Sequence, residues 1–301
     1  MPTSPIIPTR SASDNLRGIA AMLVSMAALI ANDAFFKLAA SHLPLGQAIF
    51  MRGLFASLLT AALIVYLGVL DTLPRLGEGK VLFRGVAEIV ATLLYLTALV
   101  RMPIAEATAI LQFTPLAITA GAAIFLGAAV GWRRWTATVV GLIGVLVIIR
   151  PGAAVFNPYA AVALASVVFI AARDLTTRRL GGHIPTIVIA FSSALAVMIS
   201  SLGFLPFEQW HWPEISLTLA LLASGACLLA GQFWVIVAMR TGDIALVAPF
   251  RYSIILWAIL AGFLVWRELP DLATWIGIPI VTAAGLYTFL REYRLAKAAR
   301  P

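Results

Sequence analysis

Two stretches decide the fold of this chain: GIAAMLVSMAALIANDAFF at residues 18–36 and GQAIFMRGLFASLLTAALIVYL at residues 46–67. Eight further apolar stretches follow, at residues 81–100, 104–126, 135–149, 158–172, 184–205, 215–239, 244–266 and 272–290. Most hold about 18 to 25 residues, and an α-helix needs roughly 20 to cross a 30 Å hydrocarbon core. The sequence therefore predicts an all-α integral membrane protein of ten transmembrane helices.

The composition supports this class of protein. Hydrophobic residues make up 62% of the 301 residues, charged residues make up 11%, and the mean hydropathy is +1.00. The stretches are apolar on every face, whereas a helix of a soluble domain has one apolar stripe. Membrane β-strands would be about ten residues of alternating polarity, which these stretches are not. The short gaps leave no room for a soluble domain, so we expect one compact membrane domain.

The basic residues indicate the orientation. The chain has a net charge of +8, with 21 Lys and Arg residues. Four lie on one side of the predicted membrane (Lys37, Arg101, Arg150 and Arg267), two lie inside spans (Arg52 and Arg251), and the remaining fifteen lie on the other side. This asymmetry is the positive-inside rule and predicts cytoplasmic N- and C-termini in an inner-membrane protein. The positive charge then serves orientation, and we expect no nucleic-acid partner.

Two places in the chain indicate an internal repeat of about 140 residues. The sequence NDAFFKL at residues 32–38 is comparable with RDLTTRR at residues 173–179, and residues 98–101 are comparable with residues 238–240. Five spans is an odd number, so the second copy would enter the membrane the other way up. Transporters use inverted repeats of this kind to build two alternating gates around a central site. We predict an N-terminal repeat at residues 1–152 and a C-terminal repeat at residues 153–301; chance similarity of apolar helices is the alternative.

The chain resembles a known family, the EamA type of the drug/metabolite transporter superfamily. The resemblance covers almost the whole chain and is strongest at MPIAEATAILQFTPL, residues 102–116. It continues through GLIGV at 141–145 and IRPG at 149–152, and in the second copy through ALVAPFRY at 245–252 and WRE at 266–268. The resemblance implies ten helices around a central cavity and export of small metabolites, with YddG-like amino-acid exporters as the nearest group.

One position departs from the family's pattern. The Glu that usually follows the fourth span is replaced by Ala128, while Glu268 keeps the corresponding residue of the second copy. A mechanism that needs both carboxylates is therefore in doubt for this chain.

Polar residues within the spans are the candidates for the central cavity. Arg84, Glu88, Thr92 and Tyr95 share one face of the third span, and Thr108, Gln112, Pro115 and Thr119 share one face of the fourth. The substrate-cavity candidates are Glu88, Thr92, Tyr95, Thr108, Gln112, Phe113, Pro115, Gln232, Trp234, Pro249, Arg251 and Tyr252. The alternative for the polar members is hydrogen bonding across packed helices. Tyr95, Phe113, Trp234 and Tyr252 lie deep enough to form an apolar wall for a hydrophobic or aromatic side chain.

Charges at matching depths indicate two ion pairs that gate the cavity. Glu88 and Arg251 both lie roughly 10 Å from the cytoplasmic ends of their spans, and Asp33 and Arg52 lie roughly 8 to 10 Å below the outer face. We predict Glu88–Arg251 and Asp33–Arg52 pairs near the two mouths of the cavity. The alternatives are that each Arg extends to its nearer headgroups, or that Arg251 binds a substrate carboxylate.

Prolines also fall inside spans. Pro115 and Pro249 occupy corresponding spans of the two halves, where proline removes a backbone donor and bends a helix. We predict paired hinges near the binding site, with static kinks as the alternative.

Other classes of protein fit less well. The three His residues lie in loops or at span ends, and no Gly-x-Ser-x-Gly, His-Glu-x-x-His or phosphate-loop motif is present, so we expect neither an enzyme nor an ATP-driven pump. We expect no cofactor and no metal, and a monomer. A channel is disfavoured because no selectivity-filter-like sequence occurs.

The sequence thus predicts a secondary transporter that works by alternating access. It would export aromatic or hydrophobic amino acids, or alternatively cationic drugs or nucleotide-like metabolites. Arg251 beside Glu88 would keep that carboxylate charged, so we expect movement down the substrate gradient, or coupling through another group, rather than proton carriage by Glu88.

Overall fold

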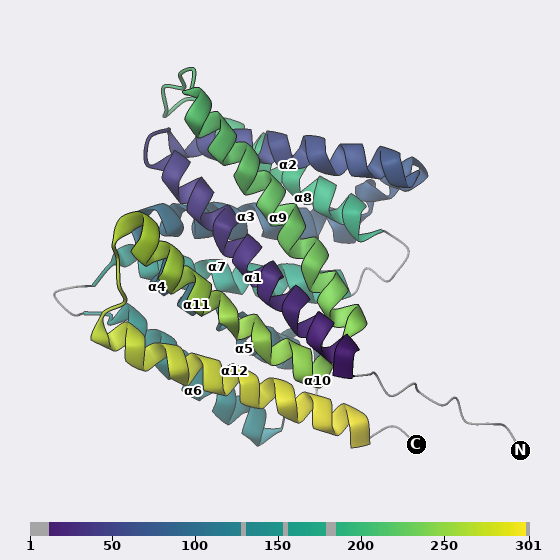
Figure 1. The fold of residues 1–301 in the computed structure, drawn as a ribbon, viewed down its shortest axis with the longest axis vertical. Coiled ribbons are helices and arrows are strands. Elements are labelled where there is room, and N and C mark those ends of the chain that lie inside the picture. The colour runs from purple at the N-terminus through teal and green to yellow at the C-terminus, as the bar shows by residue number, and fades with distance from the viewer. Residues whose placement is uncertain (1–11, 128–130, 153–155, 179–184, 299–301) are drawn as a thin grey trace, which may run out of the picture.

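The computed structural model describes residues 12–127, 131–152, 156–178 and 185–298. Figure 1 shows a bundle of long helices, and the described residues contain no β-strand. The elements in chain order are α1 (Ala12–Ala40), α2 (Leu45–Leu67), η1 (Leu70–Gly77), α3 (Gly79–Arg101), α4 (Ile104–Leu111), α5 (Thr114–Leu126), α6 (Trp132–Ile149), α7 (Pro158–Arg178), α8 (Thr186–Ser201), η2 (Leu202–Phe204), α9 (Ile215–Thr241), α10 (Ile244–Val247), η3 (Ala248–Tyr252), α11 (Ser253–Ala261), η4 (Gly262–Trp266) and α12 (Leu272–Ala298).

Ten of the described helical segments are long and apolar enough to cross a membrane, as the sequence predicts. The fourth span, Ile104–Phe125, is made of α4 and α5, and the ninth, Ala248–Trp266, is made of η3, α11 and the π-helical turn η4. The other spans differ from the prediction mainly at their ends. One of these changes bears on the site: α7 continues to Arg178 instead of ending near residue 172, so that Arg173 and Asp174 lie on a membrane-spanning helix.

The break in the fourth span has a local cause. Pro115 has no backbone N–H, so it leaves the carbonyl oxygen of Leu111 without its usual helical donor. The Thr114 hydroxyl donates to that oxygen at 2.6 Å and satisfies it. Pro249 likewise lies in the first turn of η3, at the start of the ninth span. The predicted interruptions at these two prolines are therefore present.

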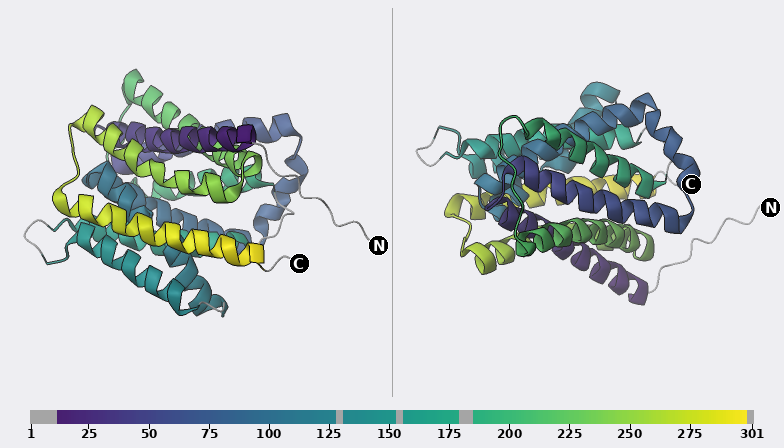
Figure 2. Two further views of the ribbon diagram at one scale, coloured as in Figure 1. Left: turned by 60° about the horizontal axis from the view of Figure 1, so that its bottom comes forward. Right: turned by 90° about the horizontal axis from the view of Figure 1, so that it is seen from above.

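The bundle has two ends that the following sections refer to. Figure 2 shows the start of α1 and the end of α12 at one end, which we call the terminal end. The opposite end, which we call the distal end, carries the α1–α2 and α3–α4 connections and the segment between η4 and α12. Helices α1 and α12 run in opposite directions between these ends.

The closest packing joins helices from different halves of the chain. Helix α1 packs along α9 and α3 packs along α7, while α2 packs against α8 and α6 against α12 (Figure 1). The α6–α12 contact depends on small residues: a side chain at Gly144 would meet Ile280 and Val281, and one at Gly277 would meet Ile148. Such residues allow membrane helices to approach closely. The two halves therefore form one packed body.

The outer surface is as apolar as the core. Tyr66, Phe125 and Phe207 are each more than three quarters exposed, as are many aliphatic side chains on the faces of the spans. A soluble monomer rarely exposes so much contiguous apolar surface, whereas a bilayer requires it. The buried core contains Ile49, Leu99 and other large side chains where helices of the two halves meet.

Candidate functional site

A polar group of buried and half-buried side chains lies toward the distal end, and we call it the distal cluster. Its centre is the Asp33 carboxylate on α1, which accepts hydrogen bonds from the Tyr95 hydroxyl at 2.5 Å and from Asn32 Nδ2 at 2.7 Å. Ser224 on α9 donates to Asn32 Oδ1 at 2.9 Å and fixes the orientation of that amide. Thr108, buried on α4, lies close to the Tyr95 hydroxyl. Four spans therefore contribute to the cluster.

Arg52 is the cation of the distal cluster, but its guanidinium forms no ion pair with the Asp33 carboxylate. It attracts Asp33 electrostatically, and its guanidinium lies over the Phe36 ring at 5.5 Å from the centroid. No salt bridge joins Arg52 to an acidic residue in the described part of the chain. The predicted Asp33–Arg52 pair is thus a long-range attraction in this conformation, and its role as a gate stays a prediction.

A second group of charges, the terminal cluster, lies about 10 Å further along α3 toward the terminal end. Its centre is Glu88, whose Oε2 accepts from Arg84 at 3.2 Å and whose Oε1 accepts from Arg173 of α7 at 3.0 Å. All three side chains are at most one quarter exposed. The ion pairs link the first half of the chain to the second.

The remaining donors of the terminal cluster are also satisfied. Arg84 donates to Thr177 at 2.9 Å and to Ser193 at 2.7 Å, and Arg173 donates to Asp174 at 2.8 Å. Two arginines therefore balance two carboxylates, and hydroxyl groups take up the spare N–H donors. Full pairing of this kind is what makes charges tolerable within a membrane.

The predicted Glu88–Arg251 pair is wrong for this structure. Both oxygens of Glu88 are occupied by Arg84 and Arg173, while Arg251 lies exposed on η3. The reason is the extra length of α7, which brings Arg173 to the depth of Glu88. Arg251 is therefore free of that carboxylate, and its alternative role in binding a substrate carboxylate stays a prediction.

The other predicted cavity residues fall into three environments. Thr92 donates to Glu88 at 3.4 Å, so the third-span stripe forms a hydrogen-bonded row. Phe113 is buried in the main core, where it contacts the space beside Gly141, and Tyr252 places its hydroxyl against Gly285 of α12. The rest are half-buried or exposed: Gln112 and Pro249 are half-buried, and Pro115, Gln232 and Trp234 are exposed. The fourth-span stripe is interrupted at the break between α4 and α5.

Sequence reasoning missed the role of Lys37. The sequence predicts that Lys37 is one of the charged residues outside the membrane. Its side chain is only 8% exposed, and Nζ donates to the Met102 carbonyl at 2.7 Å. It also lies 3.6 Å from Glu268 and 4.8 Å from the centre of the Trp266 ring. These contacts tie α1 to the α3–α4 connection and to the end of the ninth span. The only signal in the sequence was the position of Lys37 four residues after Asp33.

Glu268 thus forms an ion pair with Lys37 at the distal end. Ala128 lies outside the described residues. No group of three or more His, Cys, Asp or Glu side chains in the described part of the chain could hold a metal ion. The chemistry available to the site is therefore that of carboxylates, guanidinium groups, hydroxyls and aromatic rings.

Comparisons with known proteins show which proteins this chain is similar to. Residues 16–150 match the model of the EamA-like transporter family. The S-adenosylmethionine uptake transporter of Rickettsia conorii is 28% identical over 280 residues, covering 92% of this chain and 94% of that protein. The pseudopaline exporter CntI of Pseudomonas aeruginosa is 29% identical over 257 residues, covering 84% and 88%. The riboflavin transporter of Vibrio cholerae is 28% identical over 237 residues, covering 78% of each chain.

A crystal structure of another protein aligns with a TM-score of 0.62 at 23% identity, covering 94% of this chain and 99% of the other, and so shows the same fold. These three relatives are named as transporters, of S-adenosylmethionine, riboflavin and pseudopaline. Residues 16–150 carry an EamA-like transporter domain, and this domain, the ten spans and these relatives together support a multi-pass membrane transporter of small metabolites.

Proposed function

We propose that this transporter carries amino-acid-type metabolites, including aromatic and hydrophobic amino acids, and that Asp33 recognises their ammonium group. The observation that carries the proposal is the state of the Asp33 carboxylate. Its closest partners, Tyr95 and Asn32, are neutral hydrogen-bond donors, and Arg52 attracts it only from a distance. A buried carboxylate that lacks a close cation is well suited to bind a cationic group of a substrate.

A further polar group lies on a helix that packs against the spans of the distal cluster. The indole N–H of Trp257 on α11 is buried and finds no acceptor among the described residues. Helix α11 packs against α1 and α4, the helices that carry Asp33 and Thr108. A buried donor without a partner is costly, and a ligand carboxylate or carbonyl would satisfy it. The ring also offers an apolar face to a hydrophobic side chain.

Alternating access between two inverted halves remains our mechanism. The packing is arranged as two inverted repeats of five spans would require: α1 with α9 and α3 with α7 are equivalent pairs, and α2–α8 and α6–α12 are pairs of corresponding helices. The terminal cluster then lies between Asp33 and the terminal end of the bundle. For the cavity to open toward that end, Glu88 and Arg173 must either separate or move together. We propose residues 1–152 and 153–301 as the two repeats.

The relatives do not fix the direction of transport. One is named for uptake of S-adenosylmethionine and another for export of pseudopaline. S-adenosylmethionine carries an amino-acid head group and a sulfonium cation, which suits a site built on a carboxylate. We propose movement down the substrate gradient, which is export when the metabolite accumulates inside the cell. Cytoplasmic termini and a monomeric state are part of the same proposal, and a reporter fused to the C-terminus tests the orientation.

The test is uptake into proteoliposomes that contain the purified protein. Labelled phenylalanine, tryptophan, methionine, threonine and S-adenosylmethionine are compared, with and without an imposed pH gradient. We expect saturable uptake that unlabelled substrate inhibits and that the gradient leaves unchanged. Transport of cationic drugs or nucleotides with none of the amino-acid-type compounds would contradict the proposal and support the alternative substrate classes.

A further inference from the structure

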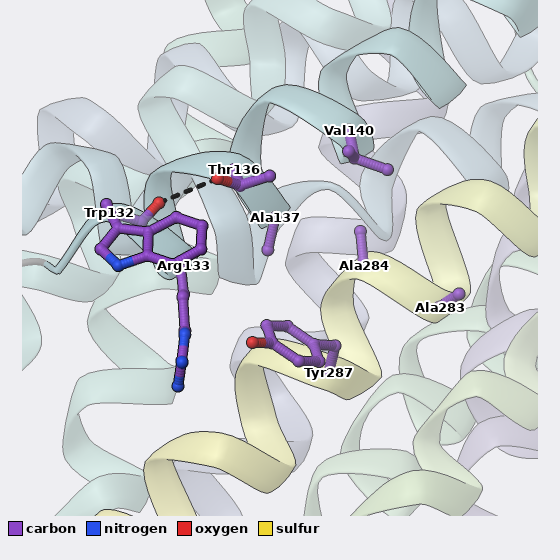
Figure 3. A pocket seen from close by; sticks show the side chains of 8 residues that line it. All are labelled: Trp132, Arg133, Thr136, Ala137, Val140, Ala283, Ala284 and Tyr287. Carbon is purple, nitrogen blue, oxygen red and sulfur yellow. Dashed lines mark hydrogen bonds between the residues drawn. The ribbon is translucent and has the colours of Figure 1, made fainter.

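A groove runs between α6 and α12 on the outer surface of the bundle, away from both clusters. Its volume is about 350 Å³, and Figure 3 shows the side chains that line it: Trp132, Arg133, Thr136, Ala137, Val140, Ala283, Ala284 and Tyr287. Trp132, Val140 and Tyr287 are each more than 40% exposed. The groove is therefore open to the surroundings of the protein, which at this depth are lipid.

The shape of the groove follows from how the two helices pack. Toward the middle of the spans, the helices approach closely at Gly144 and Gly277, where a Cβ atom would meet side chains of the other helix. Toward the terminal end, the facing positions hold larger side chains instead of glycine: Thr136 and Val140 on α6, and Tyr287 on α12. The two helices leave a groove between them there. The groove thus begins near the membrane surface and ends about two helical turns into the apolar region.

Positive charge is concentrated where the groove reaches the membrane surface. Arg133 extends along the groove beside Trp132, with its guanidinium 5.3 Å from the centre of the indole ring (Figure 3). Arg291 lies one turn beyond Tyr287 on α12 and reaches the start of α6, with Nη2 3.9 Å from the place of a Cβ on Gly131. Its Nη1 atom is buried and has no hydrogen-bond partner among the described residues.

We propose that this groove binds an anionic phospholipid. The phosphate would lie between Arg133 and Arg291 at the N-terminal end of α6, where the helix dipole also favours an anion. One acyl chain would follow the apolar floor formed by Ala137, Val140 and Ala283. Trp132 lies at the depth at which tryptophan anchors membrane proteins, beside the headgroup.

The charges argue against a second copy of this chain in the groove. A two-fold contact at this face would bring Arg133 and Arg291 of both copies together, and no described carboxylate lies within ion-pair distance of either. An anionic headgroup neutralises the same two arginines. A zwitterionic lipid would satisfy the apolar groove but would add little at the charged end.

Native mass spectrometry of the full chain in detergent tests the proposal by titration with phosphatidylglycerol or phosphatidylcholine. The variants are R133Q/R291Q, which removes the charge, and T136F, which fills the groove from an exposed position and keeps both arginines. The matched control is R101Q/R267Q, which removes two arginines at the distal end. We expect phosphatidylglycerol to bind about thirtyfold more tightly than phosphatidylcholine in the parent and the control, because each of the two arginines near an anionic surface contributes on the order of 1 kcal/mol.

The preference should disappear in R133Q/R291Q, and T136F should weaken binding of both lipids. An unchanged preference in R133Q/R291Q would overturn the proposal. A lipid-free dimer that T136F converts to a monomer would also overturn the proposal, because the groove would then be a protein interface. If R133Q/R291Q does not fold, the exposed single change R133Q is titrated in its place and must reduce the preference at least threefold.

Discussion

The terminal and distal clusters contain the same kinds of residue but differ in how their charges are neutralised. In the terminal cluster, two arginines and two carboxylates contact one another directly, and every contact lies between 2.8 and 3.2 Å. In the distal cluster, Asp33 is held by neutral donors, and Arg52 lies over the ring of Phe36 instead of on the carboxylate.

This difference indicates different roles. A closed ion network has no charge left for a substrate, and it joins α3 to α7, so it stabilises one arrangement of the two halves. A carboxylate that is bonded only to neutral groups has no cation in direct contact and is open to an ammonium group. We therefore propose gating as the role of the terminal cluster and substrate recognition as the role of the distal cluster.

The largest expected effect is on stability, in Glu88→Ala. The change leaves Arg84 and Arg173 within the membrane without their shared carboxylate, and breaking a buried pair in this way costs on the order of 3 to 5 kcal/mol. Thermal unfolding in detergent, followed by near-ultraviolet circular dichroism, measures the loss.

A double-mutant cycle distinguishes the ion pair from simple loss of packing. The loss of stability in E88Q/R173Q should be smaller than the sum of the losses in E88Q and R173Q, by about 1 kcal/mol or more. Additive effects would show that Glu88 and Arg173 are not coupled, and would remove the main difference between the clusters.

The next largest effect is on transport, in Asp33→Asn. The amide keeps the size of the side chain and can still accept from Tyr95, but it removes the charge that would bind an ammonium group. Hydrogen bonds to charged groups contribute about 1.5 to 3 kcal/mol, so transport should fall about tenfold or more, while thermal stability changes little.

Asp71→Asn is the matched control, because Asp71 is exposed in η1 and belongs to neither cluster. D71N should transport as the parent does. Equal loss in D33N and D71N, or full activity of D33N, would exclude Asp33 as the recognition group.

A smaller effect is expected for Tyr95→Phe. It removes the hydrogen bond to Asp33 but leaves the carboxylate charged, so the affinity for substrate should weaken about fivefold or less, consistent with roughly 1 kcal/mol. Uptake measured over a range of substrate concentrations separates this change in apparent affinity from a change in maximal rate. A complete loss of transport in Y95F would mean that the phenol itself binds or moves the substrate.

The smallest effect on stability is expected for Arg251→Gln, because Arg251 is exposed and is not paired with Glu88. Its thermal stability should stay within about 0.5 kcal/mol of the parent. If transport of amino acids is lost while stability is unchanged, Arg251 binds the substrate carboxylate. A large loss of stability would instead indicate that the Glu88–Arg251 pair forms in another conformation.

Most of the fold could be predicted from the sequence, because the bilayer imposes a simple rule. About 20 consecutive apolar residues form a spanning helix whatever surrounds them, and proline interrupts a helix through its own missing N–H. The ten spans and the interruptions at Pro115 and Pro249 follow from these local properties. The ends of helices were harder, since polar residues such as those of α7 can continue a helix when tertiary partners satisfy them.

The candidate site was predicted only in part. Residue type and depth identified Asp33, Glu88, Tyr95 and Arg52 as intramembrane polar groups, since such residues are costly in lipid wherever they occur. Depth alone could not choose among cations at similar levels, so Glu88 was assigned to Arg251 instead of Arg173. Lys37 was assigned to a loop for the same reason.

The sequence by itself thus determined which segments cross the membrane, where their charges lie along the membrane normal, and where the backbone must break. Only the tertiary structure decided which helices are neighbours, and with them the partners of Glu88, Asp33 and Lys37. The physical reason is that insertion into a bilayer depends on the free energy of each segment separately, whereas ion pairs and hydrogen bonds depend on atoms brought within about 3 Å by the packing of distant segments.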